Sequence, residues 1–484
     1  MQERRYERRI ILNRSFSLRR YFRTVLLFFL FVLVVFFQSG CAGIEEEKPD
    51  IKEKDVSPVL DVEPYESISA SMSAGNPEEA VKKFEDAYSE NPDSTETRLL
   101  YASLLITTGQ AEKAETVIVK ILEEDPKNPE ALYNLSLIKG MRNERPEQKE
   151  LLQKVIAADS GHAEAYASLG ELYLEDEEYD AAEENFQKSI QEDPQNFIGR
   201  SGYGHVLLRQ KKYAEAEEQF DQAVQIEPEY PYSYIDRARA RSGAGDINGA
   251  ILDLSTAMEL DPDYYWNYID RGKLYLHTGN YEGALEDFNQ AVIIDPDYFL
   301  GYVYQAGILD DLGKEEPAYN SYRKLITLRD DYYPAYEPLA LFSFSNEKYL
   351  KAAEYFDRHY QRFSKDYGHA LMSGISLLFA GEKEKGAAYL KKYMDIMPRE
   401  TYMYDIARLF TENGYDNYFI SKLVNETNIT IKVRALYYLA AYYKLQGQTR
   451  LANRYFLEVK DANIYGLYET DLAIEELSDK IEEQ

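Results

Sequence analysis

Small and large apolar residues recur along most of the chain with a period of 34 residues. Every 34th residue from Ala102 is small: Ser136, Gly170, Gly204, Ala238, Gly272, Ala306, Ala340 and Gly374. A second series, which starts at Phe84, is large and apolar: Ile118, Leu152, Phe186, Phe220, Leu254, Phe288, Tyr322, Phe356 and Leu390. One period, residues 263–296, reads as two amphipathic helices joined by Gly279 and Asn280 and ended by Pro296.

Two more series keep the same phase. The first runs from Ala80 through Ala114, Ala182, Ala216, Ala250, Ala284, Ala318 and Ala352, and only Gln148 interrupts it. The second starts at Pro92, and seven of its ten places are proline. Four series in phase at one period indicate a repeat array, in which each unit packs mainly on its neighbours.

This pattern resembles that of tetratricopeptide repeat (TPR) proteins, whose unit is a 34-residue helix–turn–helix with these small, aromatic and proline positions. The resemblance covers about residues 61–466 and implies an all-α fold, a right-handed TPR solenoid of about twelve units with a C-terminal capping helix. We expect a regular array over residues 65–400, a degenerate repeat over 401–432, a last unit over 433–466 and the cap over 467–484. Pro334 and Pro338 should bend or shorten the first helix of their unit. The acidic final helix is expected to face solvent.

The N-terminus has the pattern of a targeting signal. Eight arginines precede an apolar run over residues 25–37, which ends at Gln38-Ser39-Gly40-Cys41. Thirteen apolar residues are fewer than the roughly 20 that span a bilayer, so residues 1–40 fit a secretory signal. The segment resembles a bacterial lipoprotein signal, which implies lipid attachment at Cys41, the only cysteine. An uncleaved anchor helix that begins near Tyr21 is the alternative. Residues 41–64 are polar and aperiodic and are predicted to form a tether.

Charge and motif content narrow the possible functions. The chain has 55 Lys and Arg against 85 Asp and Glu, a net charge of −30, which disfavours binding to nucleic-acid phosphates. The five histidines have no metal-ligand spacing, and there is no Walker A loop or GxSxG motif. We therefore predict no enzyme activity, no cofactor and no metal site.

Two arginines stand where the TPR pattern prefers leucine and where the side chain points into its own helix pair. These are Arg237 and Arg271, and each is followed sixteen residues later by an aspartate, Asp253 or Asp287. Since an inward arginine needs a partner, we predict two ion pairs within the units. A basic contact to a ligand is the alternative.

The first helix of each TPR unit lines the concave face of the solenoid, and the outward positions of the central units are candidates for binding a partner. They are Tyr232, Asp236, Arg239, Trp266, Asp270, Lys273 and Tyr304. Aromatic residues among charges suit an extended peptide or a helix of another protein, and the acidic surface favours a basic or amphipathic one. The alternative is that the tyrosines simply pack between units.

Signal and repeats together predict a membrane-anchored scaffold for protein–protein interaction in a bacterial cell envelope. Ala42 after the cysteine favours the outer membrane over the inner one by analogy with other lipoproteins, and the array would lie in the periplasm or at the surface. Two alternatives stay open. One is a structural protein that binds glycan or peptidoglycan through aromatic residues, and the other is an intracellular regulatory TPR protein.

Overall fold

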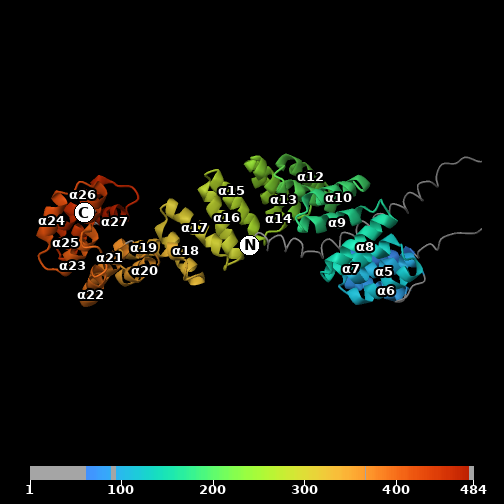
Figure 1. Ribbon diagram of the computed structural model, residues 1–484, viewed down its shortest axis with the longest axis horizontal. Coiled ribbons are helices and arrows are strands. Elements are labelled where there is room, and N and C mark those ends of the chain that lie inside the picture. Colours follow the sequence, from blue (N-terminus) through green and yellow to red (C-terminus); the bar gives the residue numbers. More distant parts are fainter. Residues whose placement is uncertain (1–61, 89–93, 366, 479–484) are drawn as a thin grey trace, which may run out of the picture. The chain divides into compact units, whose positions relative to one another are not determined.

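A computed structural model describes residues 62–88, 94–365 and 367–478 (Figure 1). These residues form twenty-five α-helices and one 3-10 helix, with no strand among them. The predicted signal, Cys41 and the tether as far as residue 61 lie outside the described residues. No helix within the described part combines the length and the apolarity needed to cross a bilayer.

The helices fall into two compact units, divided between Asp253 and Leu254. The first unit contains α3 (Val62–Ser73), α4 (Pro77–Tyr88), α5 (Thr95–Thr107), α6 (Ala111–Glu124), α7 (Pro129–Met141), α8 (Arg145–Ala158), α9 (Ala163–Glu175), α10 (Tyr179–Glu192), α11 (Phe197–Arg209), α12 (Tyr213–Ile226) and α13 (Pro231–Ala244). The division falls within α14 (Ile247–Leu260).

The second unit continues with α15 (Tyr265–His277), α16 (Tyr281–Ile294), α17 (Phe299–Asp311), α18 (Glu315–Leu328), η1 (Tyr333–Ala335), α19 (Tyr336–Ser345), α20 (Tyr349–Arg362), α21 (Tyr367–Phe379), α22 (Lys383–Met394), α23 (Tyr402–Thr411), α24 (Asp416–Val424), α25 (Ile429–Leu445), α26 (Thr449–Ala462) and α27 (Tyr468–Ser478). Within each unit the helices pack in consecutive helix–turn–helix pairs, and this confirms the predicted TPR solenoid architecture (Figure 1).

The two strongest sequence series meet inside each helix pair. The rings of Phe186, Phe220 and Phe288, on the second helices of their pairs, are fully buried. Each ring covers the small residue of its own first helix so closely that a Cβ added to Gly204 would lie 2.7 Å from Phe220. The same distance is 2.8 Å for Gly170 and Phe186. The two series therefore mark the place where a large apolar side chain of the second helix, a phenylalanine ring in these three units, packs on the first helix at close range.

A further series becomes visible only in the structure. The turn inside each pair places one residue in the left-handed region, for example Gly109 at φ 74° and Gly279 at φ 76°. The same turn position is occupied by a residue other than glycine in four units: Asn143, Glu177, Lys211 and Glu347, with φ between 54° and 61°. Because these four are not glycine, the sequence alone does not display the series.

The irregular units differ from the regular ones in helix length. The prolines 334 and 338 do shorten their helix, as predicted: the turn η1 precedes α19, which has only ten residues. In the predicted degenerate repeat, α23 and α24 have ten and nine residues, against thirteen or fourteen in most others. At the ends, α3 begins at Val62 instead of Tyr65 and α25 has seventeen residues.

Candidate functional site

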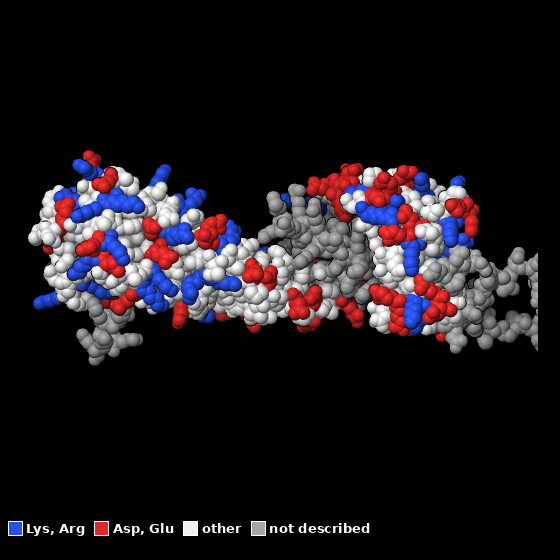
Figure 2. Space-filling model, turned by 90° about the horizontal axis from the view of Figure 1, so that it is seen from below, with Lys and Arg blue, Asp and Glu red and all other residues white. Residues whose placement is uncertain are grey.

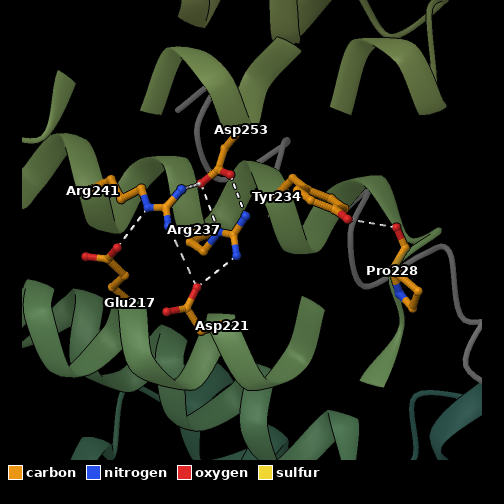
Figure 3. Close-up of polar contacts among 7 residues, drawn as sticks. All are labelled: Glu217, Asp221, Pro228, Tyr234, Arg237, Arg241 and Asp253. Carbon is orange, nitrogen blue, oxygen red and sulfur yellow. Dashed lines mark hydrogen bonds and ion pairs between the residues drawn. The ribbon is translucent and has the colours of Figure 1, made fainter. Parts of the chain in front are cut away.

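Both predicted ion pairs are present in the structure. Arg237 donates to Asp253 from Nε at 3.0 Å and from Nη2 at 2.6 Å (Figure 3). The third guanidinium nitrogen donates to Asp221 at 2.8 Å. Burial opposes the charge of Arg237, but the two carboxylates outweigh this effect and raise its pKa.

A second arginine, which was not predicted from the sequence, extends this network. Arg241 donates to Asp253 at 2.9 Å and to Glu217 at 2.8 Å, so that two guanidinium groups enclose one buried carboxylate (Figure 3). The Asp253 side chain is only 4% exposed. These arginines are therefore engaged with acids of their own and the preceding helix pair, which argues against the alternative of a basic ligand contact.

The other pair is simpler. Arg271 donates to Asp287 at 2.9 Å and 2.7 Å, and its remaining nitrogen donates to Ser255 at 2.9 Å. The Asp287 side chain is 2% exposed, and burial raises its pKa although Arg271 opposes this shift. Hydrogen bonding to Asp287 raises the pKa of Arg271. The arrangement is an internal structural pair within one helix–turn–helix unit.

The predicted partner-binding residues divide between the two compact units. In the first unit the expectation that Asp236 faces outward is wrong. Its carboxylate is buried and lies 2.9 Å from His205 Nε2 on α11, in the preceding pair. Arg239 lies 3.3 Å from the same carboxylate, and Tyr232 is half-buried with its ring 5.3 Å from that of Tyr230. Asp236 thus joins successive first helices, because their close approach buries this position.

Within the second unit, Trp266 belongs to an aromatic cluster. Its half-buried indole is stacked on Tyr265 at 5.1 Å between centroids and meets the edge of Tyr298 at 5.3 Å. Asp270 and Lys273 form an exposed pair one turn away, with Nζ and Oδ1 3.2 Å apart. Tyr265, Trp266, Asp270 and Lys273 belong to α15, whereas Tyr298 is the residue that precedes α17.

Tyr304 lies differently from its predicted place. Its ring is stacked on Phe288 with centroids 4.6 Å apart and an interplanar angle of 11°. It therefore contributes to packing between helix pairs, as the alternative interpretation of the tyrosines proposed. Trp266 and Tyr304 are both half-buried, and both pack on the same apolar cluster.

The inner face of the C-terminal repeats carries the chain's own last helix. α27 packs on α25 and α26, as a capping helix should, and it also contacts α19, more than 120 residues earlier. Tyr468 shares a hydrogen bond of 2.9 Å with Tyr438 and lies 5.8 Å from the ring of His369 on α21. The prediction that this helix faces solvent is therefore wrong for the side that holds Glu469 and Ala473, each 0% exposed.

Acidic side chains fix α27 to this face. Arg434 lies 3.2 Å from Glu469, and Lys444 donates to both oxygens of Glu476 at 2.6 Å and 2.7 Å. Ser345 donates to Glu475. Two of the acidic residues on which the prediction of a solvent-facing helix rested, Glu469 and Glu476, instead pair with basic residues of the repeats. The helix therefore buries its apolar side and part of its charged surface.

The charge of this region differs from that of the whole chain. Residues 336–467 contain eighteen Lys and Arg and fifteen Asp and Glu, whereas acids are in large excess overall. Figure 2 shows the corresponding abundance of basic side chains at the left of the view, over the C-terminal helices. An acidic helix is therefore attracted to these repeats.

The degenerate repeat leaves a cavity that the sequence did not predict. It has a volume of about 890 Å³ and lies among α21, α23, α24 and α25. Its lining includes Lys365, Tyr402, Met403, Lys422 and Arg434. Because α23 and α24 are short, they do not fill the space that a full helix pair would occupy. A cavity of this size, with both apolar and charged residues in its lining, suits a peptide side chain or a small ligand.

Models of the tetratricopeptide repeat match residues 71–136, 173–241 and 266–298. The chain therefore contains TPR repeats, and these repeats suggest a scaffold for protein–protein interaction. Similarity to solved structures is limited to the repeat fold. YrrB, described as a TPR protein with an unusual peptide-binding site, is 23% identical, with 38% of this chain and 95% of that chain covered and a TM-score of 0.35.

Two further solved structures illustrate the same likeness. For pilF of Pseudomonas aeruginosa the identity is 19%, the coverage 47% of this chain and 99% of that chain, and the TM-score 0.40. For the C-terminal part of a TPR repeat-containing protein from Cytophaga hutchinsonii, the identity is 11%, the coverage 50% and 99%, and the TM-score 0.42. A comparison with curated protein sequences found no match.

Proposed function

We propose that this chain is a scaffold that binds other proteins along its repeats while a lipid on Cys41 holds it at a membrane of a bacterial cell envelope. The repeats supply the binding function, since arrays of helix pairs present extended surfaces to peptides and helices. The N-terminal signal motivates the anchor, and Ala42 favours the outer membrane.

The observation that carries the binding function is the position of α27. This helix occupies the inner face of the C-terminal repeats through an aromatic contact at Tyr468 and ion pairs at Glu469 and Glu476. A surface that accepts one amphipathic helix of this chain is suited in chemistry to helices of other proteins. In the central repeats, we expect a partner to contact the half-buried Trp266 and the neighbouring pair Asp270–Lys273.

In-cell crosslinking followed by affinity capture tests this function with three chains: wild type, Trp266→Ala and Tyr465→Ala. Tyr465 is fully exposed and lies outside the helices, so it is a matched aromatic control. We expect an envelope protein to be captured by wild type and by Tyr465→Ala and to be lost from Trp266→Ala. Equal capture by all three would place the binding surface elsewhere. Absence of any protein partner, with saturable glycan binding that needs Trp266, would favour the glycan-binding alternative.

The anchor has its own test. In a bacterial host with two membranes, wild type and Cys41→Ser are compared for membrane fractionation and for incorporation of a labelled fatty acid. We expect label and membrane association for wild type and loss of both for Cys41→Ser. A variant that stays at the membrane without label would indicate the uncleaved anchor helix near Tyr21 instead.

A further inference from the structure

Two histidines and a glutamate from three successive helices meet in the C-terminal repeats. Glu337 lies in the first turn of α19, His359 in the last turn of α20 and His369 in the first turn of α21. Their nitrogen and carboxylate oxygen atoms lie within 4.8 Å of one another. His369 Nε2 is 3.2 Å from Glu337 Oε1, and the two imidazole rings are perpendicular with centroids 4.2 Å apart.

The surroundings of this cluster are mainly aromatic. His359 and His369 are 7% and 3% exposed, and Glu337 is half-exposed at the edge. The ring of Phe363 lies 4.7 Å from that of His359, and the rings of Phe356 and Tyr468 lie about 6 Å from that of His369. Two imidazoles and a carboxylate are thus brought together at the border of an apolar core, with one oxygen ligand accessible from solvent.

We propose that Glu337, His359 and His369 form a binding site for a divalent transition metal, with Zn²⁺ the ion that fits best. Zn²⁺ takes histidine nitrogen and carboxylate oxygen at about 2.0–2.2 Å in tetrahedral geometry, which places neighbouring ligand atoms roughly 3.3 Å apart. The pair His369–Glu337 already has this separation. The nearer nitrogen of His359 lies within 4.8 Å of these atoms, so a rotation of its side chain would complete the site.

The donor set also selects the class of ion. Ca²⁺ and Mg²⁺ prefer six or more oxygen ligands, and this cluster supplies one carboxylate. Imidazole nitrogen suits Zn²⁺, Co²⁺, Ni²⁺ and Cu²⁺. Three protein ligands leave a fourth position, which water or a side chain of a bound partner would fill.

The local fold explains how residues so far apart in sequence converge. The prolines around η1 start α19 late, so that Glu337 comes at the helix start beside the turn between α20 and α21. That turn brings the end of α20 and the beginning of α21 together and places His359 and His369 side by side. A bound ion would therefore join three helices next to the contact of α27 with α21.

The competing explanation is a purely structural cluster, in which His369 is bonded to Glu337 and His359 packs against its ring. A Zn²⁺ titration distinguishes a metal site from a purely structural cluster. The full mature chain is first stripped of metal with a chelator, and Zn²⁺ is then added in competition with a chromophoric chelator that reports the free ion. We expect one Zn²⁺ per chain for wild type and an affinity at least about 100-fold weaker for Glu337→Gln, His359→Gln and His369→Gln.

A matched control comes from His205→Gln. His205 makes a single histidine–carboxylate contact, with Asp236 at 2.9 Å, and belongs to the other compact unit, so this variant should bind one Zn²⁺ as wild type does. Co²⁺ loaded in place of Zn²⁺ should give visible absorption typical of low coordination, lost in the three cluster variants. Glu337 is half-exposed, so Glu337→Gln tests the site even if a histidine variant fails to fold. No binding by wild type, or equal binding by wild type and Glu337→Gln, would overturn the proposal.

Discussion

The ring of Phe220 lies against the backbone of Gly204, with ring carbons 2.7 Å from the position of a Cβ on that glycine. A methyl group there must displace a fully buried ring. We expect Gly204→Ala to lower the free energy of unfolding by about 1–3 kcal/mol, the usual cost of overpacking. Gly307, in a helix with open space around its Cβ position, is the control: Gly307→Ala should be neutral or stabilise by up to about 1 kcal/mol. Thermal unfolding followed by circular dichroism measures both.

Lys211 occupies a turn position with φ 60° that other units fill with glycine. The left-handed conformation costs a non-glycine residue roughly 1–2 kcal/mol. Glycine avoids this cost, but its greater freedom in the unfolded chain offsets part of the gain. Lys211→Gly should therefore stabilise the protein by about 0.5–1 kcal/mol. Its neighbour Lys212 has φ −85°, so Lys212→Gly should destabilise. If both variants destabilise equally, backbone strain at this turn is not what limits stability.

The repeat period allowed the helix pairs and the Arg237–Asp253 pair to be predicted, because the helix pairs recur every 34 residues and an arginine is followed by an aspartate sixteen residues later in two units. Such features depend on neighbours within one or two units. Asp236 was misjudged because its burial depends on how closely α11 and α13 approach, a distance that no spacing encodes. The meeting of His359 and His369 was missed because two different helices supply them at a turn.

Contacts between residues far apart in the sequence could not be predicted, for the same reason. The acidic pattern of α27 fits a solvated helix as well as one held by Arg434 and Lys444. Its contact with α19 joins residues more than 120 positions apart, which no repeat spacing encodes. One signal was present: Tyr468, Leu472 and Ala473 form an apolar stripe at helical spacing. An apolar stripe on a helix that was predicted to face solvent indicates that this side of the helix is covered by other helices.

Arg271 and Asp287 should be strongly coupled, since Asp287 is buried and Arg271 is its ionic partner. Arg271→Leu leaves a buried carboxylate without its cation and should cost about 3–5 kcal/mol. The double variant Arg271→Leu/Asp287→Leu removes both charges and should recover most of that loss, because leucine suits the position in the TPR pattern. A double-mutant cycle of unfolding free energies gives the coupling. Additive losses would show that the pair contributes little.

Asp236 should make stability depend on pH in acid. Burial opposes its ionisation, but His205 and Arg239 outweigh this effect and lower its pKa. A carboxyl with a lowered folded pKa contributes stability that is present above its unfolded value, about 3.9, and is lost as the pH falls through the folded value. We expect wild type to exceed Asp236→Asn by roughly 1–3 kcal/mol at pH 5 and the difference to shrink below pH 4. A difference that does not change with pH would contradict this.

Lys444 and Glu476 hold α27 to the repeats in a pair whose charges can be exchanged. Lys444→Glu places like charges together and should lower the unfolding free energy by roughly 1–2 kcal/mol, between the values for exposed and buried pairs. Glu476→Lys alone should do the same, and the double exchange should restore most of the loss. Protection of the α27 amides against hydrogen exchange reports whether the helix has left the face.

Removal of residues 468–484 tests what this helix covers. The helix α27 covers Tyr438, which is 0% exposed and shares a hydrogen bond of 2.9 Å with Tyr468 of this helix. Without it, a continuous apolar and basic face is left uncovered, so we expect increased binding of a hydrophobic dye and a lower melting temperature. A synthetic peptide of residues 467–484 should reverse both effects, whereas a peptide with Glu469 and Glu476 changed to Lys should not. If neither peptide binds the shortened chain, attraction between the acidic helix and the basic repeats is not the interaction that holds α27, and its attachment through the preceding loop would be decisive instead.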